Sequence, residues 1–132
     1  MRILEPLANI TRIIEMIEQS EKFVIMVSPY SFLEGWDRLK KAINEAPSRG
    51  VDFSYYVRQG EGLAGLDDLK VKIHEVPGLH AKMFFSEKEA IISSFHLMNN
   101  NDINWACVMD YPEEYNDLVG YFDEYIKKAA VN

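Results

Sequence analysis

Two short apolar runs separated by a charged turn constrain the fold of this chain most. They lie within Leu79–Leu97, LHAKMFFSEKEAIISSFHL, and predict strands at Leu79–Phe85 and Glu89–Ser94. The segment Ser86-Glu87-Lys88 between them is short and polar, which is typical of a hairpin loop. A hairpin fixes which side chains share a face, because successive strand residues point to opposite sides. We therefore expect the sheet to be organised around this hairpin.

The polar residues of the predicted hairpin share faces. His80 and Lys82 are two residues apart, and Ser94 and His96 have the same relation at the end of the second strand. The hairpin can thus present two imidazoles, an ammonium and a hydroxyl to one small volume, a set suited to holding a phosphate. The alternatives are a half-exposed strand with outward polar residues, a serine that satisfies backbone groups and a loop histidine without a task.

The remaining chain alternates between helical and strand patterns. The expected elements, in order, are helix 5–20, strand Phe23–Val27, helix Glu34–Ala46, strand Val51–Val57, short helix Leu63–Leu69, strand Val71–Val76, the hairpin, strand Ile103–Met109 and helix Glu113–Ala130. This order predicts an α/β sandwich, with a mixed β-sheet flanked by helices on both faces. A length of 132 residues predicts a single domain over 1–132.

Three other features receive structural interpretations. Ser28 and Tyr30 follow the buried strand at Phe23–Val27 and are expected to be turn residues, although ligands often bind at the carboxyl end of such a strand. The pair Tyr55-Tyr56 is expected to pack in the core or at a sheet edge rather than stack on bases. His74 lies on an alternating strand and is expected to have a structural place.

Charge and cysteine content exclude some classes of protein. The net charge of −7 argues against a protein that grips long nucleic acid with its whole surface, although it permits a small basic pocket. The single cysteine, Cys107, lies in an apolar run and predicts a buried thiol in a reducing compartment. No Cys/His spacing suggests a metal site. The charged N-terminus resembles neither a signal peptide nor a membrane span, so a cytoplasmic protein is expected.

A resemblance to a known family rests on the hairpin. His80-Ala81-Lys82, then Glu87, then Ser93-Ser94-Phe95-His96 resemble the His-x-Lys pair, the acid five residues later and the Gly-Ser-x-Asn stretch of the phospholipase D superfamily. The runs FVIMVSPY and SRGV are similar to the opening pattern of that family. The resemblance covers nearly the whole chain and includes the closing helix.

The resemblance implies phosphodiester chemistry without a metal or other cofactor. In that family one histidine attacks phosphorus to form a phosphohistidine, and a second protonates the leaving oxygen. Lysines and hydroxyls hold the phosphate oxygens, which implies catalytic roles for His80 and Lys82 and phosphate binding by Ser94 and His96. The family needs two His-x-Lys motifs per site, and this chain has one. The resemblance therefore implies a homodimer in which His80 of both copies faces one phosphate.

The chain departs from the family pattern at four positions. Glu87 replaces the usual Asp, Ser93 the Gly and His96 the Asn. Asn104 stands where the family tends to place a Glu that orients the catalytic imidazole, and Asp102 is a possible substitute for that Glu. For Glu87, a supporting role is expected, either as a solvated turn carboxylate or in an ion pair across the dimer.

Two functions follow as hypotheses. The first is a phosphodiesterase, nearer to a nuclease than to a lipase, without stable membrane association and acting on short or single-stranded substrates because the chain is acidic. The second is a catalytically degenerate phospholipase D-like domain that serves as a binding or dimerisation module. A third possibility is that the chain is one domain of a longer protein.

Overall fold

A seven-stranded mixed sheet forms the centre of the molecule. The computed structural model describes residues 1–5, 8–61, 63, 65–98 and 104–131. The strand order is β1-β9-β7-β6-β2-β4-β5, in which β2, β4 and β5 are parallel and the other neighbours pair antiparallel. The strands are β1 (Arg2–Ile3), β2 (Phe23–Val27), β4 (Asp52–Arg58), β5 (Lys72–Val76), β6 (Met83–Ser86), β7 (Ala90–Ser93) and β9 (Ala106–Val108). The predicted mixed α/β fold is confirmed.

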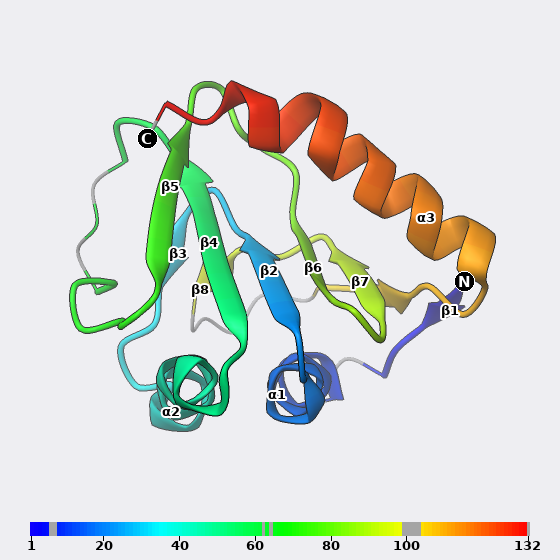
Figure 1. Ribbon diagram of the computed structural model, residues 1–132, viewed down its shortest axis with the longest axis horizontal. Coiled ribbons are helices and arrows are strands. Elements are labelled where there is room, and N and C mark those ends of the chain that lie inside the picture. The colour runs from blue at the N-terminus through cyan, green and yellow to red at the C-terminus, as the bar shows by residue number, and fades with distance from the viewer. Residues whose placement is uncertain (6–7, 62, 64, 99–103, 132) are drawn as a thin grey trace.

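Helices cover both faces of the sheet. Helices α1 (Asn9–Gln19) and α2 (Asp37–Glu45) lie side by side on one face, and α3 (Pro112–Tyr121) crosses the other (Figure 1). Helix α3 continues through a π-helical turn, Phe122–Ile126, and a short 3-10 turn, Lys127–Ala129. The prediction of helices on both faces is therefore correct.

Strand β2 is buried on both faces, as its continuous apolar sequence predicts. Val24 and Met26 belong to the core under α1 and α2, whereas Val27 belongs to the core under α3. The neighbouring strand β6 divides in the same way, with Phe84 on the first side and Phe85 on the second. The alternation of side chains along these two strands thus builds two separate cores.

The hairpin differs from its prediction at one end. Strand β6 begins at Met83, so His80 and Lys82 lie in the segment before the strand instead of within it. The reason is the partner strand, because Met83 pairs with Val27, the last residue of β2. Pro29 follows soon after, and a residue without a backbone N–H cannot continue a ladder.

Two smaller elements also differ from expectation. The helix predicted at Leu63–Leu69 is wrong, since Gly65–Asp68 forms a turn. A parallel pair, β3 (Ser31–Phe32) with β8 (Leu97–Met98), was not predicted, because two-residue strands carry no periodic signal. Asp102, the possible substitute for the orienting Glu, lies outside the described residues.

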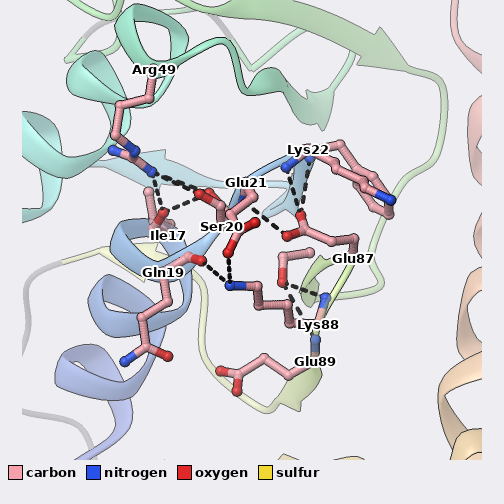
Figure 2. A network of polar contacts seen from close by, with 11 residues as sticks. Ile17, Gln19, Ser20, Glu21, Lys22, Arg49, Glu87, Lys88 and Glu89 are labelled. Atoms are coloured by element: carbon pink, nitrogen blue, oxygen red, sulfur yellow. Dashed lines mark hydrogen bonds and ion pairs between the residues drawn. The ribbon is translucent and has the colours of Figure 1, made fainter.

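The carboxylate of Glu87 holds the start of β2. It accepts backbone N–H bonds from Glu21 (2.9 Å), Lys22 (3.1 Å) and Phe23 (3.1 Å), as Figure 2 shows. Burial alone would raise the pKa of Glu87, but these N–H donors favour the charged form and lower the pKa below its usual value. Beside it, Lys88 donates to the Gln19 carbonyl oxygen and pairs with Glu21. The turn after β6 therefore fastens the hairpin to the end of α1 and the start of β2.

Replacing Glu87 by Ala is expected to lower the free energy of unfolding by about 1–3 kcal/mol, because three backbone donors lose their acceptor. Because the pKa of Glu87 is lower in the folded chain than in the unfolded one, its contribution is complete above the unfolded pKa and is lost as the pH falls through the folded pKa. Urea unfolding of the wild type and Glu87→Ala across acidic pH measures both the loss of stability and its pH dependence. The matched control is Glu124→Ala, which removes an exposed pair with Lys128 and should change stability by less than about 0.5 kcal/mol. Equal changes in the free energy of unfolding for the variants at positions 87 and 124 would refute a stabilising role for the backbone contacts of Glu87.

Candidate functional site

Two histidines and a lysine meet where β2 ends and β6 begins. His80 and Lys82 come from the segment before β6, and His96 lies between β7 and β8. The rings of His80 and His96 are edge to face, with centroids 5.7 Å apart. Lys82 is near enough to act electrostatically on the His96 ring. The structure thus brings together three of the four residues that the sequence predicted for a phosphate site.

Burial and neighbouring positive charges in this cluster disfavour the protonated forms of Lys82 and His96. His80 is exposed, whereas Lys82 and His96 are half-buried. Burial lowers the pKa of Lys82. Burial, followed by the positive charges of Lys82 and His80, lowers the pKa of His96 from 6.5 to about 4. His96 is therefore neutral at pH 7, in a site that favours the arrival of an anion.

The fourth predicted residue, Ser94, makes its described hydrogen bonds elsewhere. Its hydroxyl accepts the backbone N–H of Trp105 at 2.9 Å and lies 3.2 Å from Asn104 Oδ1, to which it can donate. A hydroxyl has one hydrogen, so this donation occupies it. Ser94 and Asn104 therefore join the end of β7 to the start of β9, directly before the segment that carries His96.

Glu87 lies far from this cluster along β6. His80 precedes the strand and Glu87 follows it, so the two residues flank opposite ends of Met83–Ser86. The carboxylate is engaged by the backbone at the start of β2. Within the described part of the chain, no ion pair joins His80 to a carboxylate.

Ser28 and Tyr30, interpreted from the sequence as turn residues, position His96. The Ser28 hydroxyl accepts the N–H of Leu97 at 2.8 Å, a buried bond that anchors the residue next to His96. The same hydroxyl donates to the Tyr30 carbonyl oxygen at 3.1 Å. The Tyr30 ring packs edge to face on His96, with centroids 4.7 Å apart. The sequence signal for this role was the Ser-Pro-Tyr run at the carboxyl end of a buried parallel strand.

A second layer of hydroxyls supports Ser28. Tyr55 Oη donates to Ser31 Oγ at 2.6 Å, and Ser31 Oγ donates to the Ser28 carbonyl oxygen at 3.0 Å. Burial raises the pKa of Tyr55 above its usual value, so its hydroxyl remains a donor. Tyr55 is therefore a core residue, as predicted, whose polar end contributes to the turn beneath the site.

An open pocket of about 250 Å³ adjoins the cluster through Tyr30. It lies beyond the carboxyl ends of β2 and β4, the end of parallel strands where ligands bind in open α/β sheets. Its lining consists of Pro29, Tyr30, Ser31, Phe32, Val57, Glu61, Leu66 and Met98. Two aromatic rings and several apolar side chains thus stand next to the cationic cluster.

The described ranges contain no group of three or more His, Cys, Asp or Glu side chains arranged to hold a metal ion. None of the helices in those ranges is long and apolar enough to cross a bilayer.

Comparison with known proteins gives matches by structure alone. No family model and no curated protein sequence matches the chain. NucT from Helicobacter pylori superposes with a TM-score of 0.78 at 17% identity, over 98% of this chain and 96% of that one. Nuc from Salmonella typhimurium, a phospholipase D family member, superposes with a TM-score of 0.68 at 17% identity, over 91% and 87% of the two chains. The chain has a phospholipase D-like fold.

A larger protein contains the same fold as a part. Phosphatidylserine synthase from Haemophilus influenzae superposes with a TM-score of 0.68 at 18% identity, over 95% of this chain and 36% of that one. The phospholipase D-like fold inferred from the hairpin motif is therefore confirmed. At identities this low, the matches establish the fold alone, and the chemistry has to be argued from the residues of the site.

Replacing Ser28 by Ala is expected to lower the free energy of unfolding by about 1–3 kcal/mol, because the buried Leu97 N–H loses its acceptor. The loss should also loosen His96, which a broadened or shifted His96 ring signal would report. The control is Ser48→Ala, which removes an exposed hydroxyl bonded to the Glu45 carbonyl oxygen. An unchanged His96 signal in Ser28→Ala would refute the positioning role of Ser28.

Proposed function

We propose that the chain is a metal-independent phosphodiesterase of the nuclease kind, with its site at His80, Lys82 and His96. The observation that carries this proposal is the contact of the two imidazoles at 5.7 Å beside the lysine, in a phospholipase D-like fold. The three side chains bring nitrogen donors together at this place, and Glu87 lies at the other end of β6. Such a set binds an anion and suits a phosphate.

His80 is the proposed nucleophile because it is the exposed imidazole of the pair. A ring nitrogen attacks phosphorus, the bond from phosphorus to the leaving oxygen breaks, and that oxygen takes a proton from an acid. Water then gives a proton back to that acid as it attacks the phosphohistidine, the P–N bond breaks, and His80 is regenerated with a phosphomonoester as product. Lys82 faces the negative charge that grows on the phosphate oxygens in both steps.

The leaving-group acid is proposed to be His80 of a second copy. The chain carries one His-x-Lys motif, and a two-fold axis places the same patch of both copies in contact. One copy then supplies the nucleophile and the other supplies the proton. This arrangement makes a homodimer a requirement for turnover.

The substrate is proposed to be short or single-stranded nucleic acid. A net charge of −7 disfavours binding of a long phosphate backbone over the whole surface, so the attraction is confined to the cationic cluster. The pocket beside Tyr30 offers space for the organic group on one side of the phosphate. A nucleoside fits the aromatic part of this lining better than a second phosphate does, because Glu61 also lines the pocket.

A non-catalytic phosphate-binding module is the second candidate. It is favoured by Asn104, which occupies the place of the expected orienting carboxylate and accepts from Ser94. An amide cannot offset imidazolium charge as a carboxylate does. Such a module would bind phosphate with His80, Lys82 and His96 but would not turn over a diester.

We expect the wild type to hydrolyse bis(4-nitrophenyl) phosphate in the presence of EDTA. In His80→Asn the rate of hydrolysis is expected to fall by at least about 10³-fold, because the nucleophile is lost. His74→Gln is the matched control, since His74 stacks on Tyr56 away from the cluster. Turnover that persists in His80→Asn, or that EDTA abolishes, would refute the proposed mechanism. No turnover together with phosphate binding would favour the second candidate.

Mixing the wild type with His80→Asn tests the shared site. If turnover needs His80 from both copies, an equal mixture that has exchanged subunits retains about one quarter of the activity of the same total amount of wild type, whereas independent sites retain about one half. Light scattering on the same samples is expected to show a dimer. A monomer with full activity would contradict the composite site.

A further inference from the structure

The two nitrogens of the His96 ring are in different situations. Nδ1 is buried and has no hydrogen-bond partner in the described part of the chain. The ring meets Tyr30 on one side and His80 on another, both edge to face. Nε2 is therefore the nitrogen that remains to reach a ligand in the cluster.

We propose that His96 acts as a neutral imidazole, with its hydrogen on Nε2, and donates that hydrogen to a nonbridging phosphate oxygen. His96 is then an electrophilic support of the phosphate and not the second acid–base histidine. The inference deepens the proposed phosphodiesterase function and rests on it for the identity of the ligand.

The first argument is the cost of an unpaired donor. An imidazolium carries N–H groups on both nitrogens. Protonated His96 would therefore bury a charged N–H at Nδ1 without an acceptor, which is more costly than leaving a neutral nitrogen there. The neutral ring with its hydrogen on Nε2 avoids this cost and presents its donor to the site.

The second argument is the surrounding charge. Within the described residues, the charged and titratable groups found to contact or act on the ring are His80 and Lys82, from the segment before β6, and Tyr30, from the segment after β2. Two of these groups carry or acquire positive charge, and none is a carboxylate. Their effect adds to burial, and together they lower the pKa of His96 to about 4.

The two histidines, His80 and His96, therefore have different chemical roles. A neutral N–H donor stabilises charge on the phosphate in both steps without gaining or losing a proton. Since a neutral imidazole is too weak an acid to protonate the leaving oxygen, that oxygen must take its proton from another group. His80 of a second copy is the group that the proposed dimer supplies.

The chemical state of His96 can be measured directly by NMR. The chain has three histidines, so ¹⁵N-labelled imidazole signals can be assigned from single substitutions. We expect the Nε2–H tautomer at pH 7, a protonation midpoint for His96 well below the ordinary 6.5, and a shift of the His96 signals when inorganic phosphate is added. His74, stacked on Tyr56, is the internal reference and should not respond to phosphate. An Nδ1–H tautomer, or an imidazolium that forms at pH 7 on phosphate binding, would overturn the proposal.

Two variants separate a donor from an acid. In hydrolysis of bis(4-nitrophenyl) phosphate, His96→Asn retains a neutral N–H donor and is expected to keep kcat within about tenfold of the wild type. His96→Ala is expected to lose about 10²–10³-fold in kcat, the usual effect of one missing oxyanion donor. An acid–base role predicts instead that both variants fail equally, which would overturn the inference. Thermal unfolding of each variant shows whether an activity loss reflects a folding defect.

The outcomes distinguish this inference from the proposed function. The tautomer and the phosphate response are measured on wild-type protein and do not require turnover. Absence of hydrolysis with a phosphate-responsive Nε2–H tautomer would overturn the phosphodiesterase and support the state of His96. Hydrolysis by a protein in which His96 is an imidazolium would support the phosphodiesterase and overturn the proposed state of His96.

Discussion

The buried hydrogen bond from the Leu97 N–H to the Ser28 hydroxyl is the contact on which the site depends. It joins the end of the central strand β2 to the segment after β7, two parts of the chain 69 residues apart. His96 immediately precedes Leu97, so the bond fixes where its ring can lie. The hydroxyls of Ser31 and Tyr55 support the Ser28 turn from below. A site made of side chains from separate segments is thus held by a buried polar network at a strand end, and partial loss of such a network is costly.

An acidic chain can nevertheless build an anion site, because only local charges decide the affinity of a small pocket. The net charge of −7 acts over distances at which salt screens it. Lys82 and His80 act on His96 at close range and under partial burial, where screening is weaker. A compact anion would therefore meet only the local charges of the cluster, whereas a long polyanion would also meet the acidic surface.

The sequence predicted the sheet class, and that His80, Lys82 and His96 lie together, better than it predicted where the strands begin and end. The apolar run at Phe23–Val27 specified a buried strand correctly, because burial on both faces leaves an unbroken apolar pattern. The pair His80 and Lys82 was placed on a strand that begins only at Met83, since the ladder stops where β2 gives way to a proline. The contact of His96 with Tyr30 could not be predicted, because it is set by a tertiary hydrogen bond and not by local spacing.

The departures from the family motif affect different properties of the molecule, because they lie at different places in the fold. Glu87 stands at the end of β6 remote from His80, where its carboxylate serves three backbone donors. A longer carboxylate in place of an aspartate there bears on the stability of the hairpin and leaves the phosphate site untouched. The change at His96 lies in the cluster itself, whereas Asn104 lies beside Ser94 between the ends of β7 and β9. If His96 is a neutral donor, it preserves the chemical role of the amide that it replaces, so this departure from the motif is compatible with phosphate binding.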